Sequence, residues 1–256
     1  MNGAYRSLAA PTAPPRISVA RAPGACYLPH AMAVALIADA HLGGPGGAAG
    51  PLVEQLLALP KEGAERLLLL GDLFQAWIGD PRFETPEVTA VVATLRRLRA
   101  AGLRIDYIEG NRDFFLADSP YADAFDAVSL EVAFTLGGTR YLAVHGDGLN
   151  DRDWQYRFWR RLSKSRPVEL AVRRTPRALA RRMVDSTEAR LSQTNFKHKR
   201  ELPEAAIRAY AERRLAEGYD VLLLGHFHEP RILPVAGGEV RLLNAWFRER
   251  RVEWLR

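Results

Sequence analysis

Residues 33–41 read AVALIADAH, in which six apolar residues are followed at once by Asp39 and His41, two candidate metal donors separated by one residue. A short continuous apolar run predicts a strand buried on both faces, as in the parallel sheets of α/β proteins. In open sheets of that class, ligands bind beyond the carboxyl ends of the strands. The stretch therefore predicts an α/β fold with a polar site at one edge of its sheet.

Four further strings offer candidate donors, most of them directly after another apolar run. These strings are Gly71-Asp72, Gly110-Asn111-Arg112-Asp113, His145-Gly146-Asp147 and Gly225-His226-Phe227-His228. Side chains at i and i+2 of an extended backbone point to the same side. We therefore expect Asp39 and His41 to reach one ion, and the spacing of His226 and His228 is interpreted in the same way.

The candidate donors combine oxygen and nitrogen atoms and include no thiolate. They are Asp39, His41, Asp72, Asn111, His145, His226 and His228. Such a set suits Mn²⁺, Fe²⁺, Zn²⁺ or Mg²⁺, and two ions can activate water and clamp a phosphoryl group. Any one of these histidines alone could be a structural side chain. Four histidines in such strings, with aspartates beside them, favour a two-metal hydrolytic centre.

Strands and helices are predicted to alternate from residue 33 to residue 108. The expected strands are 33–38, 67–70 and 104–108, and the expected helices are 51–59 and 86–101. This β-α-β-α-β order predicts a parallel sheet with right-handed crossovers.

The second half of the chain has a different pattern. We expect a hairpin at 131–144, a helix at 203–217, a strand at 220–224 and antiparallel strands at 231–235, 239–243 and 251–255. The expected architecture is two mixed sheets packed face to face, with helices outside.

Residues 1–31 are rich in Ala, Pro and Arg and have neither a helical nor a strand period. We expect Met32 to be the natural first residue and residues 1–31 to be a disordered extension or a mis-annotated start; an ordered arm is the alternative. Residues 32–256 are expected to form a single domain with a basic helical lid at about 151–200.

Positive charge is concentrated in that expected lid. The whole chain carries +6, whereas residues 151–200 hold 15 Lys or Arg and only 5 Asp or Glu. A basic segment in an otherwise slightly acidic chain suggests an anionic partner, namely phosphate groups, nucleic acid or an acidic membrane surface, and the alternative is a merely solvated helical face. No apolar run approaches the roughly 20 residues needed to span a bilayer. The only cysteine, Cys26, excludes an intrachain disulfide, which fits a cytoplasmic protein.

In this order, the motifs DxH, GD, GNxD, HGD and GHxH resemble those of the calcineurin-like metallophosphoesterases. The resemblance implies a four-layer α/β/β/α sandwich and a site for two divalent ions, with Mn²⁺ as the expected metal. It implies that one ion is held by Asp39, His41, Asp72 and His228, and the other by Asp72, Asn111, His145 and His226.

A narrower likeness within that family is to the diphosphatases of UDP-2,3-diacylglucosamine, which act in the lipid A pathway and release UMP and 2,3-diacylglucosamine 1-phosphate. Residues 71–80, 110–114 and 145–147, followed by Tyr156, carry this likeness. It is close over residues 33–160 and 221–230 and loose across the lid, which in those enzymes caps the site and holds the acyl chains. Here the segment 154–161 interleaves aromatic residues with arginines, which suits a phosphate-bearing lipid at a membrane surface and would equally suit single-stranded nucleic acid.

The same likeness implies substrate contacts, which we expect from Asn111, Arg112, Asp153, Ser186, Arg190, Gln193 and His226. Arg190 and Gln193 stand where asparagine and lysine are usual, and Glu229 stands where arginine is common. These departures leave the metal chemistry intact and bear on the specificity for lipid and sugar.

Arg112 bears on the type of bond that is cleaved. Most members of the broad family have a histidine at this position, which can protonate a leaving alkoxide, whereas arginine is not an acid near neutral pH. Its planar fork grips phosphate oxygens, and a phosphate leaving group, with a second pKa of about 6, departs without an acid. We therefore expect pyrophosphate cleavage, with Asp72, Asn111, Arg112 and His145 as catalytic residues. The alternative role for Arg112 is a structural salt bridge with Asp113.

The first functional hypothesis is a metal-dependent hydrolase of UDP-2,3-diacylglucosamine in the cytoplasm or at the periphery of the inner membrane. The alternative keeps the site and changes the substrate to a nucleotide or another phosphodiester. A third hypothesis, from another class, is a non-catalytic module that binds nucleic acid or membrane through the basic segment.

Overall fold

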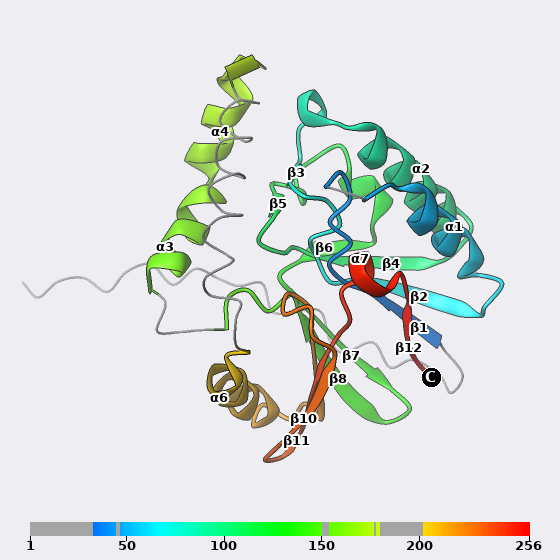
Figure 1. Cartoon of the computed structure of the whole chain (residues 1–256), viewed down its shortest axis with the longest axis vertical. Coiled ribbons are helices and arrows are strands. Elements are labelled where there is room, and N and C mark those ends of the chain that lie inside the picture. The colour runs from blue at the N-terminus through cyan, green and yellow to red at the C-terminus, as the bar shows by residue number, and fades with distance from the viewer. Residues whose placement is uncertain (1–32, 45–46, 150–153, 177, 180–201) are drawn as a thin grey trace, which may run out of the picture.

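Two five-stranded sheets form the centre of the structure (Figure 1). The structure is a computed structural model that describes residues 33–44, 47–149, 154–176, 178–179 and 202–256. The first sheet has the order β12-β1-β2-β4-β6. Its strands are β1 (Ala33–Ile37), β2 (Ala64–Leu69), β4 (Arg104–Ile108), β6 (Ala127–Ser129) and β12 (Glu253–Leu255). All neighbours in this sheet are parallel except β12, which runs antiparallel to β1.

Two helices connect the parallel strands of the first sheet, α1 (Gly50–Ala58) and α2 (Pro86–Ala100). The Thr85 side chain caps α2 by accepting the backbone N–H of Val88, Pro86 fits the first turn, and Gly102 with φ of 99° follows the end of the helix. The predicted β-α-β-α-β unit is confirmed, and the helix ends fall within a residue of the predicted ones.

The second sheet has the order β10-β11-β9-β8-β7. Its strands are β7 (Glu131–Leu136), β8 (Thr139–Val144), β9 (Val221–Leu224), β10 (Arg231–Val235) and β11 (Gly238–Leu242). The pairs β7–β8 and β10–β11 are antiparallel hairpins, whereas β8, β9 and β11 are mutually parallel. The sequence correctly predicted these strands, although not that β12 returns to the first sheet.

The remaining elements are short or lie outside the sheets. They are α3 (Trp154–Ser163), α4 (Arg166–Arg174), α6 (Glu204–Leu215), α7 (Trp246–Glu249), the two-stranded pair β3 (Trp77–Ile78) and β5 (Asp113–Phe114), and the 3₁₀ turns η1 (Pro81–Phe83) and η2 (Ala122–Ala124). The sequence did not predict α7, β3, β5 or β6.

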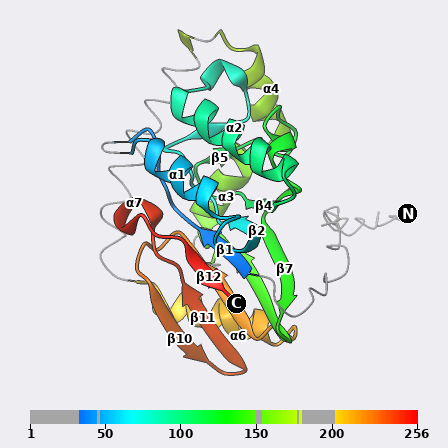
Figure 2. The same ribbon diagram turned by 90° about the vertical axis from the view of Figure 1, so that its right-hand side faces the viewer.

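The apolar contacts define the layers. Leu52 of α1 and Val91 of α2 pack on the outer face of the first sheet, and Ile207 of α6 packs on the outer face of the second. Between the sheets, residues of β1 and β2 meet residues of β7 and β9. Figure 2 shows β1 and β2 of the first sheet next to β7 of the second. Successive residues of β1 alternate between these two cores, as the pleat of a strand requires. The predicted α/β class with two mixed sheets is confirmed.

The α3–α4 segment (residues 154–174) stands along one side of the sheets (Figure 1). Neither of its helices contains a buried residue. Within the described part of the chain, no helix has both the length and the apolar character to cross a bilayer. Residues 1–32, 150–153 and 180–201 lie outside the described residues, so the expectations for the amino-terminal segment and for much of the lid remain predictions.

Candidate metal centre

All five donor strings lie just beyond the carboxyl ends of strands. Asp39 follows β1, Asp72 follows β2 and Asn111 follows β4; in the second sheet, His145 follows β8, and His226 and His228 follow β9. The strands that carry the donors are parallel to one another within each sheet, β1, β2 and β4 in the first sheet and β8 and β9 in the second. Because the two sheets face each other, the structure brings all seven candidate donors to one edge.

The backbone at this edge is turned rather than extended. Five of the candidate donors have positive φ angles: Asp39 (53°), His41 (45°), Asp72 (54°), His226 (67°) and His228 (57°). Non-glycine residues adopt this conformation at a cost of order 1 kcal/mol each, and such residues cluster at functional sites. The prediction of an extended backbone at Asp39 and His41, and at His226 and His228, was therefore wrong. Asp39 and His41 nevertheless converge in one cluster, as the spacing predicted. The strands end before these residues, and left-handed turns aim their side chains instead.

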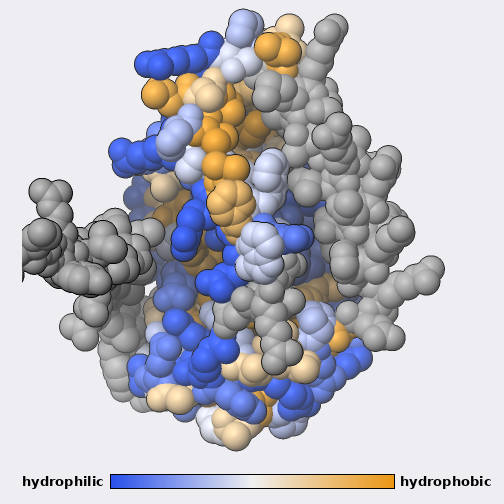
Figure 3. Space-filling view, turned by 90° about the vertical axis from the view of Figure 1, so that its left-hand side faces the viewer, coloured by the Kyte–Doolittle hydropathy of each residue, from blue (hydrophilic) through white to orange (hydrophobic). Residues whose placement is uncertain are grey.

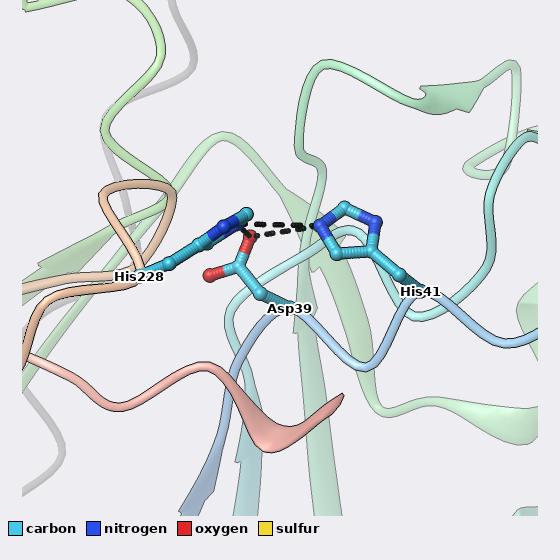
Figure 4. A group of neighbouring side chains, drawn as sticks. All are labelled: Asp39, His41 and His228. Atoms are coloured by element: carbon cyan, nitrogen blue, oxygen red, sulfur yellow. Dashed lines mark hydrogen bonds and ion pairs between the residues drawn. The ribbon is translucent and has the colours of Figure 1, made fainter. Parts of the chain in front are cut away.

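A first cluster is formed by Asp39, His41 and His228 (Figure 4). The Nε2 atoms of the two imidazoles are 3.3 Å apart, and Asp39 Oδ1 is 3.1 Å from His228 Nε2 and 3.7 Å from His41 Nε2. The second oxygen of Asp39 accepts the backbone N–H of His226 at 2.7 Å. Three lone-pair-bearing atoms that converge in a buried place fit one divalent cation.

A second cluster is formed by Asp39, Asp72 and His145. The Nδ1–H of His145 donates to the carbonyl of Leu70 at 2.6 Å, which leaves the Nε2 lone pair facing Asp72 Oδ2 at 3.7 Å and Asn111 Oδ1 at 3.2 Å. A hydrogen bond that fixes the other ring nitrogen is typical of a metal-ligating histidine. The ring of His226 lies beside that of His145, with 5.1 Å between their centroids.

The electrostatics of the site also fit cations. Burial raises the pKa of Asp72, and the nearby charge of Asp39 raises it further. Burial would also raise the pKa of Asp39, but the hydrogen bond to His228 and the surrounding histidines bring it well below its usual range. Burial opposes protonation of His145, yet the carboxylates of Asp72 and Asp39 raise its pKa. Two buried carboxylates this close together need positive charge, which a divalent ion supplies.

Gly71 and Gly110 allow the loops to approach each other closely. Gly71 has a φ of 80°, and a Cβ there would lie 2.6 Å from the backbone nitrogen of Gly110 and 2.9 Å from His145 Nδ1. A Cβ on Gly110 would overlap the carboxylate of Asp72. Only glycine fits at these two positions, because the donor loops pack directly against each other.

Asp113, the last residue of the GNRD string, connects two of these loops. Its Oδ2 accepts the backbone N–H groups of Asp72 at 3.0 Å and Gly110 at 2.7 Å, and burial together with the charge of Asp72 raises the pKa of Asp113 to about 6. The neighbouring Arg112 contacts Asp72. Its backbone N–H donates to Asp72 Oδ1 at 2.9 Å, and its Nε lies 3.7 Å from Asp72 Oδ2. The positioning role of Asp113 was not predicted from the sequence.

One face of α3, together with Lys164 directly after it, contacts the donor loops. The carboxylate of Asp147 accepts the hydroxyl of Tyr156 at 2.7 Å and the Nε–H of Arg160 at 2.5 Å, while Lys164 Nζ donates to the carbonyl of Gly110 at 2.6 Å. Arg160 and Lys164 follow Tyr156 by one and two helical turns, and this i, i+4, i+8 spacing could have been recognised in the sequence.

The opposite face of α3 is apolar and exposed. Trp154 is 69%, Phe158 62% and Leu162 44% exposed. Figure 3 faces the side of the molecule on which α3 and α4 lie, and orange apolar side chains lie there next to blue hydrophilic ones.

Four predicted substrate residues cannot be placed: Asp153, Ser186, Arg190 and Gln193 lie outside the described residues. Glu229 is exposed and forms an ion pair with Arg231.

The fold and the donor arrangement define the class of this protein, which is that of the metal-dependent hydrolases known as calcineurin-like metallophosphoesterases. No protein-family model matches the chain. The chain is 30% identical over 227 residues to a UDP-2,3-diacylglucosamine hydrolase of Ralstonia nicotianae, covering 83% of each protein, and 34% identical to one of Azotobacter vinelandii, covering 73% of this chain and 79% of the relative. The chain therefore belongs to the UDP-2,3-diacylglucosamine hydrolase family.

Among solved structures, phosphopantetheinyl hydrolase from Mycobacterium tuberculosis is similar with a TM-score of 0.44 and 16% identity, covering 87% of this chain and 95% of that one.

Proposed function

We propose that this protein hydrolyses the pyrophosphate of UDP-2,3-diacylglucosamine to UMP and 2,3-diacylglucosamine 1-phosphate, as its family suggests. The observation that carries the proposal is the place of Arg112, whose guanidinium Nε lies 3.7 Å from Asp72 at the donor edge. A cation that cannot act as an acid, held next to the reacting phosphate, matches cleavage of a bond whose leaving group is itself a phosphate.

We propose two metal sites with a shared carboxylate. Asp39, His41, Asp72 and His228 would hold one ion, and Asp72, Asn111, His145 and His226 would hold the other. Three members of the first set, Asp39, His41 and His228, converge in one cluster, which supports this assignment. In the second set, Asp72 and His145 converge, with Asn111 and His226 beside His145. The two clusters share Asp39, whereas the resemblance gives the shared role to Asp72. We propose Mn²⁺ because the resemblance implies it, and the donor set, which mixes oxygen with imidazole and has no thiolate, suits it. When bound, such ions lower the pKa of water and offset the negative charge that develops on the phosphoryl oxygens.

The residues of the chain bind and orient the substrate. Asn111 and Arg112 would hold the oxygens of the phosphoryl group in line for attack, and His226 would contact the substrate from the second sheet. We keep Asp153, Ser186, Arg190 and Gln193 as proposed contacts to the sugar and its acyl chains.

The exposed apolar face of α3 supports a further part of the proposal, a peripheral contact with an anionic membrane such as the inner membrane. Trp154 and Phe158 project from a helix whose only charged side chains are the arginines Arg157, Arg160 and Arg161. We expect Trp154→Ser combined with Phe158→Ser to reduce co-sedimentation with vesicles that contain anionic phospholipid. Ile232→Ser, which removes an equally exposed apolar residue from β10, is the matched control. Equal loss in both variants would contradict this part.

The decisive experiment measures UMP release from UDP-2,3-diacylglucosamine by the Mn²⁺-loaded protein, beside hydrolysis of a chromogenic phosphodiester. The proposal expects UMP in equal amount to the lipid monophosphate and much slower cleavage of the diester. Efficient diester cleavage without UMP would favour a broader phosphodiesterase instead. A parallel assay after chelation checks that release depends on the metal.

A further inference from the structure

Arg112 is fixed by its neighbours through both its backbone and its side chain. Its carbonyl accepts the N–H of Trp77 at 2.8 Å, where β3 pairs with β5. Its guanidinium Nη1 donates to the backbone carbonyl of Gln75 and to the side-chain Oε1 of Gln75, both at 2.9 Å. Gln75 therefore contributes two acceptors to the same nitrogen, three residues after the donor Asp72.

Gln75 is itself well placed between two loops of the site. Its backbone N–H donates to the carbonyl of Leu42 at 2.9 Å, next to the bridge that joins Leu42 to Phe74. Its side-chain amide packs against Gly44 so closely that a Cβ on Gly44 would overlap it. The side chain is thus confined between the loop that follows β1 and the guanidinium of Arg112.

The chemistry of glutamine suits this position. An amide oxygen accepts a hydrogen bond from the guanidinium and so fixes the plane of that group. A flexible side chain that is already held in its working orientation loses less conformational entropy when it binds a phosphate.

We propose that Gln75 is a positioning residue that orients Arg112 toward the phosphate oxygens of the substrate. This proposal deepens and rests on the proposed function, since it takes Arg112 to be a phosphate ligand. Gln75 does not touch the reacting atoms, so its effect is exerted entirely through Arg112.

The test compares Gln75→Met, which keeps the length of the side chain and removes the acceptor, with Gln75→Glu, which keeps an acceptor. In the UMP-release assay we expect Gln75→Met to raise KM about 10-fold while kcat falls less, because a hydrogen bond to a charged group is lost. Gln75→Glu should recover most of that loss. Gln155→Met, on an exposed glutamine of α3, is the matched control and should behave as the unmodified protein.

A double-mutant cycle separates positioning from a general structural effect. In an Arg112→Lys background, whose ammonium lacks the planar fork, Gln75→Met should change kcat/KM by less than about 2-fold. The proposal is overturned if Gln75→Met costs as much in that background as in the native one, if it costs nothing in the native one, or if Gln75→Glu fails to recover the loss.

A binding measurement keeps this proposal distinct from the proposed function. The affinity of the Mn²⁺-loaded protein for inorganic phosphate, measured by calorimetry, should fall about 10-fold in Gln75→Met and recover in Gln75→Glu. If the native protein released no UMP but phosphate binding followed this order, the proposed substrate would be wrong and the role of Gln75 would stand. Unchanged phosphate affinity in Gln75→Met would overturn the role of Gln75 whatever the substrate.

Discussion

The donor edge of the two sheets and the α3–α4 segment beside it are held in opposite ways. At the edge, Asp39, Asp72 and His145 are almost completely buried and each is fixed by a hydrogen bond to backbone. In α3 and α4 no residue is buried. The groups that we propose for the chemistry are therefore held by the core itself, whereas the segment that would meet the lipid is held by polar contacts. The donor edge is thus preorganised by burial, whereas the α3–α4 segment can adjust its position because none of its helical residues is buried.

The largest effect is expected from a substitution that removes a negative charge from the donor edge. Asp72→Asn should lower kcat/KM for UMP release by on the order of 10³-fold or more, because the shared carboxylate would no longer neutralise the ions. Asp123→Ala, which removes an exposed carboxylate paired with Arg96, should leave kcat/KM unchanged. Equal rates for Asp72→Asn and the native protein, with metal still bound, would show that the edge is not catalytic.

The second prediction concerns how tightly the edge is packed, and it uses two glycines with similar backbone angles. Gly71 and Gly63 have φ of 80° and 87°, but a Cβ on Gly71 would collide with Gly110, whereas nothing lies within 4 Å of one on Gly63. Gly71→Ala should lower the free energy of unfolding by about 3 kcal/mol and Gly63→Ala by only about 1 kcal/mol. Urea denaturation of both variants measures the difference, and equal losses would mean that the loops can separate without cost.

The third prediction follows from the buried carboxyl of Asp113, whose pKa is raised to about 6. Between pH 4 and 6 the carboxyl of Asp113 stays protonated in the folded protein, whereas the same carboxyl is ionised in the unfolded chain. The contribution of Asp113 to the free energy of unfolding is therefore greatest below pH 4 and declines as the pH rises to 6. Asp113→Asn keeps an acceptor for the two backbone N–H groups and removes the titration. In chelator-treated protein, the unfolding free energy of the native chain should therefore fall by on the order of 2 kcal/mol relative to the variant across this range. If the unfolding free energies of the native chain and of Asp113→Asn changed with pH in parallel, the raised pKa of Asp113 would be contradicted.

The smallest expected effect is on the α3–α4 segment. Arg160→Met combined with Lys164→Met removes its contacts with Asp147 and Gly110. We expect about a 10-fold loss in kcat/KM and faster amide exchange in α3, because the helix is no longer held against the donor loops. The melting temperature should hardly change, since α3 contributes no residue to the core. Arg161→Met, on an exposed residue of the same helix, is the control. A large drop in melting temperature would show that α3 is an integral part of the core.

The sequence predicts those parts of the fold that consist of local patterns. The continuous apolar runs at 33–38 and 67–70 identify strands because buried parallel strands require them, and Pro86 and Gly102 mark the ends of α2. The strands β3 and β5 have only two residues each, and α7 has a single turn. Such short elements depend on partners that are distant in the sequence, so no local period indicates them.

The sequence also predicts the donors of the site but not the way they are positioned. Asp39 and His228 are recognisable as candidate metal donors by residue type and by their place after apolar runs. Their positive φ angles are not, because neither residue is a glycine and no residue pattern signals the turn. Gln75 was missed for a related reason: a neutral side chain in a loop has no functional pattern until its contact with Arg112 is seen.

One feature of the donor edge governs when the site can exist. Asp39 and His228 are separated by 189 positions, and the strand that follows His228 at the very end of the chain, β12, pairs with β1 beside Asp39. The first half of the chain can form its parallel strands during synthesis, yet it cannot complete the first cluster, because His228 has not been made. Loading of an ion at that cluster is therefore a late event in biogenesis, and a ribosome-bound chain truncated before residue 228 should take up less metal than the finished protein.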